Sequence, residues 1–362
     1  MHFIPERILV TDESWEDPAA HEMLARLPGI PLARISSAEE AAEILGRTPD
    51  PVSAGKRCLM LARRGGRFMN PCPGDGAEMC CNYRVLNLAA NCPMDCTYCV
   101  LQSFLSNPAV VVFTNIEAAL DEVRETLGGS PRQTYRIGTG DLGDSLALDH
   151  ITHYSRRLVP LFARWQNAIL ELKTKSDEIS NLEGLDHQGR TVVSWSVNSR
   201  GVLRGEEFRT AGLEMRIASA RRCQAWGYRT GFHFDPLICY PGWEADYAEA
   251  VREIFEAVDP EGVAWVSLGG LRFTSQLRDV IRARFPKSGI TYGEFVPGNH
   301  GKWRYFRPIR EEMYAALSAS IRHCAPGVPV YLCMENRAAW RRGMGGGPAD
   351  AAALSDLLDQ RV

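Results

Sequence analysis

Three cysteines crowd one short stretch of the chain: Cys92, Cys96 and Cys99, with the spacing C-x3-C-x2-C. Thiolates are the usual protein ligands of iron–sulfur clusters, and a cubane cluster held entirely by protein takes four of them. A loop that supplies three thiolates therefore leaves one iron of a [4Fe–4S] cluster open to a ligand that is not protein. The rest of the chain has to fold around this loop.

Two simpler interpretations of these cysteines are weaker. A structural zinc site needs a fourth Cys or His close by, and none follows Cys99 before His150. A thioredoxin-like redox pair gives Cys92 no role. The spacing is instead similar to that of the radical S-adenosylmethionine (SAM) enzymes. In those enzymes SAM chelates the open iron, and an electron from the cluster cleaves SAM to a 5′-deoxyadenosyl radical.

The composition favours a metal protein of the reduced cytoplasm. The 362 residues are enough for one large α/β domain with an addition. We expect no membrane span, because no run of about 18 apolar residues occurs, and no signal peptide. Most of the 11 cysteines lie in the first third, which argues for metal binding over a disulfide framework. The net charge of −3 gives no global support for nucleic acid, so any such site would be a local basic patch.

Strand and helix patterns alternate through the middle of the chain. Repeated βα units form parallel sheets with right-handed crossovers, and six strands instead of eight predict a partial (β/α)6 barrel of the TIM type. Active-site residues of such barrels lie at the carboxyl ends of the strands, where the cysteine loop follows the first strand. The predicted strands are 83–88, 134–138, 168–173, 191–196, 230–235 and 262–267, with helices at 115–127, 149–165, 176–183, 212–226 and 243–258.

Smaller parts flank the barrel. Before it, alternating strands and helices predict a small α/β unit, and a linker rich in glycine and proline follows. The linker carries Cys72, Cys80 and Cys81, for which a second metal site and plain packing of thiols are both open. The predicted parts are the N-terminal unit at 1–65, the linker at 66–82, the barrel at 83–270, a C-terminal β-hairpin and helix cap at 271–345, and a tail at 346–362.

Aromatic and basic residues alternate in the predicted hairpin. Lys302, Trp303, Arg304 and Tyr305 follow a glycine-flanked turn at 299–300. Rings that stack on unpaired bases, next to cations that hold phosphate, are typical of single-stranded nucleic-acid binding. The alternative is an amphipathic hairpin whose rings pack on the barrel. The sequence leaves both open.

Between residues 81 and 332 the order and spacing of motifs resemble the spore photoproduct lyase family. Similarity to the radical SAM enzymes alone would not reproduce so many stretches in order. The matching stretches are Cys81-Asn82-Tyr83, the cysteine loop through Leu101-Gln102, Asp144, 148–153, Thr174-Lys175, 196–200, 231–236, Gly242-Trp243 and Lys302-Trp303 onward.

The resemblance implies a fold, cofactors and partners. It implies a partial (β/α)6 barrel, a [4Fe–4S] cluster on the three cysteines, bound SAM and an electron donor of the flavodoxin or ferredoxin type. It also implies a DNA lesion as substrate, with the hairpin wedging the damaged strand. Asp235 stands where the family has a different residue. The implied SAM contacts are Tyr98, Asp144, Lys175, Ser196, Asn198 and Asp235.

The route by which the lyases return a hydrogen atom to their product is missing from its usual place. The family's donor cysteine is expected just upstream of Asp144, where this chain has Asp141. The tyrosine after the third cluster cysteine is Val100 here. A carboxylate cannot donate a hydrogen atom to a carbon radical as a thiol does. Either another donor substitutes, or the reaction ends differently.

Cys333 is our candidate for a substitute donor, together with Tyr331 and with Asp141 in the donor's former place. Cys333 closes a predicted strand at 328–334, and its alternative is plain core packing. Cys239 is a second contender. Three functions remain open at this stage: a radical SAM enzyme acting on a DNA lesion or other nucleic acid, one acting on a small molecule or peptide, and a protein that binds a cluster and DNA without turnover.

Overall fold

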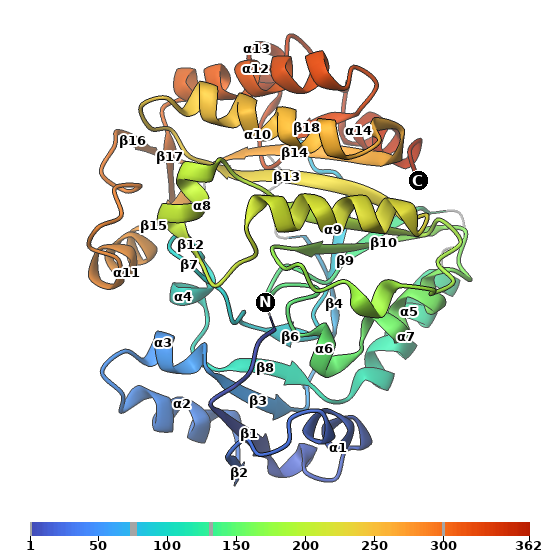
Figure 1. The fold of residues 1–362 in the computed structure, drawn as a ribbon, viewed down its shortest axis with the longest axis vertical. Helices are drawn as coiled ribbons and strands as arrows, with labels where there is room; N and C mark the ends of the chain where they lie inside the picture. Colours follow the sequence, from blue (N-terminus) through green and yellow to red (C-terminus); the bar gives the residue numbers. More distant parts are fainter. Residues whose placement is uncertain (1, 73–77, 130–132, 299–300) are drawn as a thin grey trace.

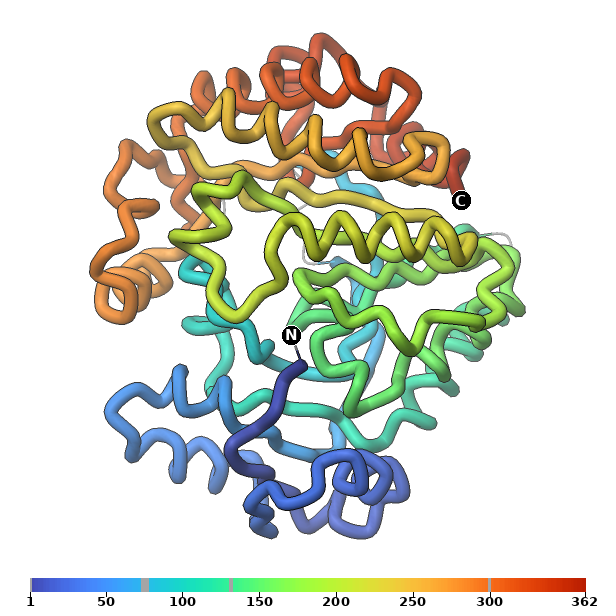
Figure 2. Tube along the Cα trace, viewed as in Figure 1, coloured from blue at the N-terminus to red at the C-terminus, as the bar shows by residue number. Residues whose placement is uncertain are grey.

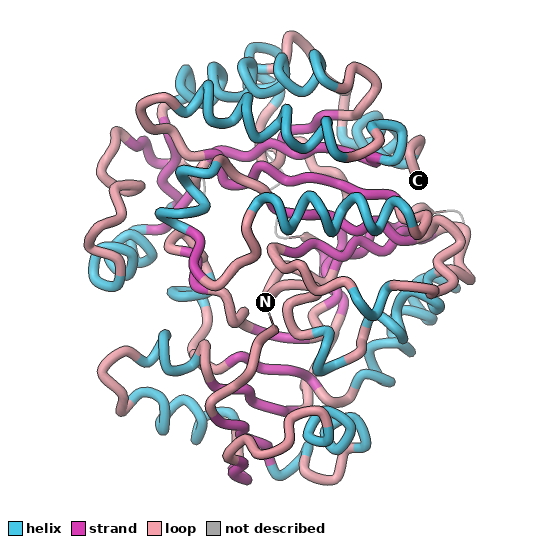
Figure 3. The backbone as a smooth tube through the Cα atoms, in the orientation of Figure 1, coloured by secondary structure: helices cyan, strands magenta, loops and turns pink. Residues whose placement is uncertain are grey.

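The computed structural model describes residues 2–72, 78–129, 133–298 and 301–362. Two large sheets lie one above the other (Figure 1), and most helices lie outside them (Figure 3). The upper sheet is the predicted barrel, and the lower one belongs to the N-terminal unit. No helix in the described ranges is long and apolar enough to cross a membrane.

All six strands predicted for the barrel are present and pair in parallel. A seventh parallel strand extends the sheet at one edge, and an antiparallel strand ends it at the other. No pairing joins the two edges within the described residues, so the partial barrel is confirmed. Across the sheet the strands are β18 (Val330–Leu332), β14 (Val263–Gly270), β13 (Arg229–Leu237), β11 (Thr191–Ser196), β10 (Ala168–Thr174), β9 (Tyr135–Gly138), β5 (Tyr83–Leu86) and β4 (Met69–Pro71).

Amphipathic helices cover the barrel. The first of them buries Ile116, Leu120, Val123 and Leu127, at the spacing of three or four residues that places side chains on one helix face. Such stripes pack against the sheet, whose parallel strands are apolar on both faces. The long helices of this layer are α5 (Ile116–Gly129), α9 (Leu213–Ala225), α10 (Trp243–Ala257) and α12 (Arg307–Cys324).

The single helix predicted at 149–165 is wrong, because the chain breaks there. It forms α6 (Asp149–Thr152) and α7 (Ser155–Phe162). His153 between them has a φ of 53°, in the left-handed region, which ends α6. The Asp149 carboxylate accepts hydrogen bonds from the Ser155 amide (2.9 Å) and hydroxyl (2.6 Å), and these bonds fix the start of the second helix.

The helix predicted at 176–183 is also wrong. The structure has only a single 3-10 turn there, η2 (Ser180–Leu182). The side chains of Thr174, Ser176 and Glu178 each accept a hydrogen bond from the amide two residues ahead. These local bonds satisfy amides that would otherwise start a helix.

The lower sheet takes strands from both sides of the linker. Two of them come from the chain immediately before and after the cysteine loop, so this loop is anchored at both ends in the N-terminal unit. Figure 2 shows this cyan segment running between the blue N-terminal unit and the green and yellow barrel. One hydrophobic core includes Ile8 of the lower sheet and Leu170 of the barrel. Across the sheet the strands are β2 (Leu32–Ile35), β1 (Arg7–Thr11), β3 (Cys58–Ala62), β8 (Val110–Phe113) and β6 (Ala89–Ala90).

The predicted C-terminal hairpin is present and belongs to a three-stranded antiparallel sheet. Its predicted turn at 299–300 lies outside the described residues. The predicted tail at 346–362 contains one short helix, and another short helix lies just before it. The elements of this part are β15 (Arg272–Thr274), α11 (Ser275–Arg284), β16 (Phe295–Pro297), β17 (Lys302–Tyr305), α13 (Arg337–Gly343) and α14 (Ala351–Asp359).

Candidate active site

The three cysteines gather at the carboxyl end of the barrel. Cys92 and Cys96 are buried beside Met94 and Ala147, and the half-buried Cys99 packs against them. Zinc would bring three sulfur atoms to roughly 3.8 Å of one another, given Zn–S bonds of about 2.3 Å. Among the described residues, these sulfur atoms do not form a set within 4.8 Å. The spacing does not match a mononuclear zinc site.

A buried lysine lies directly behind the cysteine loop. Lys56 follows α3 (Pro51–Gly55) and is 0% exposed. Its ammonium group donates hydrogen bonds to the carbonyls of Cys92 (3.1 Å) and Met94, and no carboxylate in the described ranges pairs with it. Burying an uncompensated charge costs several kcal/mol. Three thiolates on an iron–sulfur cluster would supply the missing negative charge, so the donor set and the cation both fit such a group.

The outer side of the loop is braced from two directions. The Arg284 guanidinium of α11 bonds both Asp95 oxygens at 3.2 Å and the Ser53 hydroxyl of α3 at 2.8 Å. The Gln102 side chain, on α4 (Leu101–Phe104), donates to the carbonyls of Cys96 and Thr97, both at 3.0 Å. These contacts fix the loop backbone before any cofactor is present.

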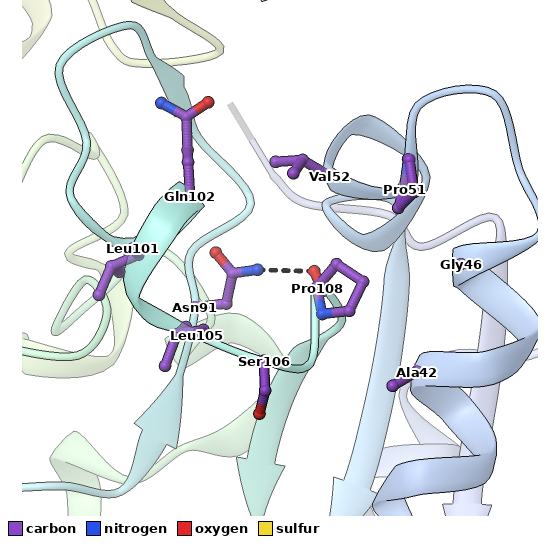
Figure 4. Close-up of a pocket in the computed structure, with 10 residues that line it drawn as sticks. All are labelled: Ala42, Gly46, Pro51, Val52, Asn91, Leu101, Gln102, Leu105, Ser106 and Pro108. Carbon is purple, nitrogen blue, oxygen red and sulfur yellow. Dashed lines mark hydrogen bonds between the residues drawn. The ribbon is translucent and has the colours of Figure 1, made fainter. Parts of the chain in front are cut away.

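A small pocket opens between this brace and the N-terminal unit. Its walls are α3, α4 and α2 (Ala38–Gly46), and the Asn91 side chain crosses its floor to the Pro108 carbonyl at 2.6 Å (Figure 4). The lining is mainly aliphatic and carries no charged side chain. The pocket therefore separates the two parts locally but offers no group for chemistry.

Beside the cysteines lies a buried carboxylate that sequence reasoning missed, Glu207. It sits on the two-residue strand β12 (Glu207–Phe208), which pairs with β7 (Asp95–Cys96) and places Glu207 opposite Cys96. Glu207 collects three of the predicted SAM contacts: it accepts from the Tyr98 hydroxyl, from Lys175 at 3.2 Å and from Asn198 at 3.5 Å.

Two cations keep this carboxylate ionised. Burial alone would raise the pKa of Glu207, but Lys175 and Arg216 bring it down to about 2. Arg216 donates to Glu207 at 2.7 Å and also to the carbonyl of Ser196, another predicted SAM contact. Two cations against one anion leave a net positive charge, which suits the carboxylate of an amino-acid ligand.

Asp144 contributes indirectly to the group of residues around Glu207. Its carboxylate accepts from the amides of Leu146 (3.0 Å) and Ala147 (2.8 Å), from the Thr174 hydroxyl (2.6 Å) and from the Lys175 amide (2.7 Å). These four bonds occupy most of the acceptor capacity of the carboxylate. Asp144 is therefore placed to hold Lys175 at the end of β10.

The remaining predicted residues gather around a second missed residue, Lys173. Burial alone would lower its pKa, but Glu171, Cys333 and Asp235 raise it, with Asp141 adding to the effect. Burial raises the pKa of Asp141, which Lys173 and Lys302 oppose. The structure thus brings Asp141, Asp235 and Cys333 together around Lys173. This group adjoins the one around Glu207, because the Asn198 amide donates to the carbonyl of Pro236, the residue after Asp235, at 3.1 Å.

Arg272 joins this second group and orients it. One guanidinium nitrogen lies 3.1 Å from both oxygens of Asp235, and the other donates to the Cys333 carbonyl at 3.2 Å. Tyr331 is buried on β18 and interacts electrostatically with Cys333. Cys239 lies elsewhere, where its amide donates to the Tyr305 hydroxyl.

Of the linker cysteines, Cys72 approaches the same group. Burial raises its pKa to about 11, with Cys81 and Asp141 as neighbours that add to the shift. Cys72, Cys80 and Cys81 do not form a three-ligand set within 4.8 Å among the described residues. Two thiols, Cys72 and Cys333, therefore adjoin the group that contains Lys173 and Asp141.

The hairpin residues divide between surface and interior. Lys302 is half-buried and lies near Asp141, and Trp303 bonds the Ser275 hydroxyl at 3.0 Å and keeps part of its ring accessible. Arg304 donates to the Met334 carbonyl at 3.1 Å. Tyr305 is buried and stacks on Phe295, with ring centroids 4.8 Å apart. Of these four nucleic-acid candidates, Tyr305 is buried and the other three are partly accessible.

The missed residues differ in the signal that they leave in the sequence. Lys173 lies two residues from both Glu171 and Lys175, and this spacing places alternate residues on one face of a strand, so it could have been found. Glu207 belongs to an isolated two-residue strand after α8 (Arg200–Glu206). Lys56 follows a five-residue helix. Neither Glu207 nor Lys56 lies in a run of residues whose strand or helix spacing would reveal its position.

A partial barrel with three cysteines in the loop after its first strand defines the class of radical SAM enzymes. The family model of spore photoproduct lyase matches residues 3–326. The chain belongs to the spore photoproduct lyase family, as its motifs implied.

Individual relatives agree in length and fold. Spore photoproduct lyase of Geobacillus sp. (strain Y412MC61) is 26% identical over 315 residues, which cover 84% of this chain and 90% of the relative. That of Bacillus subtilis (strain 168) is 25% identical over 325 residues, or 86% and 92% of the two chains. A solved double mutant of spore photoproduct lyase with bound AdoMet and dinucleoside spore photoproduct has a TM-score of 0.82 at 24% identity, covering 92% of this chain and 99% of that one.

Proposed function

We propose that this chain is a radical SAM enzyme that acts on a photoproduct lesion in DNA. The observation that carries the proposal is the three-thiol loop, with the Glu207 group beside it and a buried lysine behind it that has no carboxylate partner among the described residues. Cys92, Cys96 and Cys99 would hold the [4Fe–4S] cluster. When bound, the cluster and SAM supply a 5′-deoxyadenosyl radical that abstracts hydrogen from the substrate.

The group of residues around Glu207 would bind and orient SAM. Lys175, held by Asp144, would contact the methionine carboxylate, and Asn198 would bond the ribose hydroxyls. Tyr98 lies under the Lys175 ammonium, whose nitrogen is 5.5 Å from the ring centroid, and restricts its position. Ser196 would add a hydroxyl to the same group of SAM-binding side chains. Asp235 precedes Pro236, whose carbonyl accepts from Asn198, and Arg272 already holds the Asp235 carboxylate.

The overall test is an anaerobic incubation of reconstituted enzyme with dithionite, SAM and irradiated DNA, followed by mass spectrometry. The expected products are 5′-deoxyadenosine and DNA from which the photoproduct has been removed. Intact SAM together with unchanged irradiated DNA under reducing conditions would contradict the radical function itself. A flavodoxin or ferredoxin that replaces dithionite would identify the class of electron donor.

A small-molecule or peptide substrate is the second candidate function. It is favoured by the burial of Tyr305 and by the internal bond of Arg304, which leave the hairpin fewer side chains to contact DNA. Formation of 5′-deoxyadenosine without any change in irradiated DNA would support this alternative.

Lys302→Ala is expected to weaken binding of lesion-containing DNA and to lower the slope of log K against log salt by about 1, because one phosphate contact is lost. The measurement is a gel shift at several salt concentrations. Lys287→Ala, at an exposed lysine outside the barrel mouth, is the matched control and should bind as the unaltered chain does. An unchanged slope in Lys302→Ala would remove Lys302 from the substrate site.

Cys333→Ala is expected to reduce repaired product by at least about 10-fold while 5′-deoxyadenosine still forms, because a thiol hydrogen would quench the product radical. The S–H bond breaks and the product C–H bond forms, which leaves a thiyl radical on sulfur. Product ratios are followed by mass spectrometry. Cys72→Ala is the parallel variant, and Asp141→Cys in the Cys333→Ala background should restore product. Unchanged products in Cys333→Ala would leave that residue to core packing.

A further inference from the structure

Two histidines and a glutamate from distant parts of the chain meet outside the cysteine site. The ligand atoms of His2, His150 and Glu178 all lie within 4.8 Å of one another, and no other set of three His, Cys or carboxylate ligands in the described ranges does so. His2 precedes β1, His150 belongs to α6, and Glu178 lies in the loop after β10. The N-terminal end of the chain is seen beside α6 in Figure 1.

His150 has the hydrogen bonding of a metal ligand. Its Nε2 lies 2.9 Å from the Phe3 carbonyl, which can only accept, so Nε2 carries the proton. Its Nδ1 therefore presents a lone pair, and this atom is buried without a hydrogen-bond partner. Metal-binding histidines typically donate the other ring N–H to a backbone carbonyl in this way. Burial lowers the pKa of His150, which keeps the lone pair free of a proton.

Glu178 is oriented in a complementary way. Its side chain is only 5% exposed, and Oε1 accepts hydrogen bonds from the amide (3.2 Å) and hydroxyl of Ser180. The other oxygen, Oε2, lies 2.9 Å from Nδ1 of His2. No lysine or arginine among the described residues pairs with this buried carboxylate. One oxygen is thus held from behind while the other faces the two imidazoles.

We propose that His2, His150 and Glu178 form a binding site for one divalent transition metal ion of the zinc class. Two imidazoles and a carboxylate suit such ions, and three protein ligands leave a fourth position for water. The ion would fasten the segment before β1 to two barrel loops, those that follow β9 and β10. These loops also carry Asp144 and Lys175, so the ion would stabilise the residues proposed to bind SAM without contacting SAM itself.

The test uses the cluster-loaded protein, so that the cysteines are occupied by iron and cannot take up the probe. The protein is equilibrated with Zn²⁺, freed of unbound ion, and its zinc and iron are counted by mass spectrometry of the metals. One zinc per chain is expected, and His150→Ala should reduce this to near zero with the iron content unchanged. His21→Ala, at an exposed histidine of α1 (Pro18–Ala25), is the matched control and should retain the zinc.

Thermal unfolding gives a second, independent measure. Added Zn²⁺ should raise the Tm of the loaded protein, and Glu178→Gln should weaken zinc affinity by more than the roughly 10–100-fold seen when an outer partner is lost. Zinc that binds equally in His150→Ala, or no zinc in the unaltered chain, would mean that His2, His150 and Glu178 do not form a metal site and that His2 and Glu178 form only an ion pair. Either result would overturn the metal site without affecting the proposed function at the cysteines.

Discussion

Lys56→Met is expected to lower the reduction potential of the [4Fe–4S] cluster by on the order of 100 mV. A unit charge about 8 Å away, in an effective dielectric of about 20, contributes about 2 kcal/mol, or about 90 mV for one electron. Removing the cation destabilises the reduced cluster more than the oxidised cluster, because reduction adds negative charge. Net charge near a cluster is one of the factors that set its potential. Potentiometric titration followed by electron paramagnetic resonance measures the shift.

The same substitution should act differently on the cluster-free chain. There the ammonium has only two carbonyl acceptors, so its replacement by an apolar side chain of similar size should leave the stability equal or higher. Lys287→Met is the control, since Lys287 is exposed. A potential that does not move, or a cluster-free chain that is strongly destabilised, would mean that Lys56 supports the loop only by hydrogen bonding.

Glu207→Gln is expected to destabilise the fold by about 3–5 kcal/mol, because it leaves the fully buried Arg216 without its counter-ion. It should also weaken SAM binding, since Lys175 loses the acceptor that positions it. Glu206→Gln is a matched control: within the described part of the chain, the Glu206 carboxylate accepts from the hydroxyls of Thr97 and Ser288 alone, and weakening these bonds should cost about 1 kcal/mol. Denaturant unfolding and SAM titration measure the two effects.

The pH dependence of stability follows from the same pair. The pKa of Glu207 is depressed to about 2 in the folded chain, against about 4.3 for an unfolded glutamate. Its contribution is therefore fully present above about pH 4.3 and is lost as the pH falls towards 2. Glu171, whose pKa is also lowered to about 2, adds to this slope. Glu207→Gln should show a flatter decline between these pH values, and equal slopes would exclude the ion pair as its source.

The sequence predicts the parts of the site that obey a regular rule. Cysteine spacing selects the candidate metal ligands, and the rule that parallel strands present their carboxyl ends at one edge places Lys175, Ser196 and Asn198 near them. It fails where a residue arrives from an irregular segment. Glu207 reaches the site through a strand of two residues, and its partner Arg216 is a buried cation on a helix.

Local competition explains the remaining errors in the fold. Hydroxyl and carboxylate side chains between residues 174 and 180 satisfy the backbone amides that the predicted helix needed. The aromatic and basic pattern of the hairpin is equally compatible with packing, and only the burial of Tyr305 decides which rings face inward. The strands β6 and β8 were not predicted: β6 has only two residues, whereas β8 is a run of three valines and a phenylalanine whose strand propensity was overlooked.

The lower sheet has a practical consequence for anyone who wishes to shorten this protein. Its outer two strands, β6 and β8, come from either side of the cysteine loop, and Lys56 reaches that loop from within the first 65 residues. Deleting the first 65 residues would remove the strand that pairs with β8 and the Lys56 side chain that bonds the loop, and would expose the apolar side chains of β8. The leading segment therefore supports the cysteine loop, and a shortened fragment that is to keep this loop in place would have to retain it.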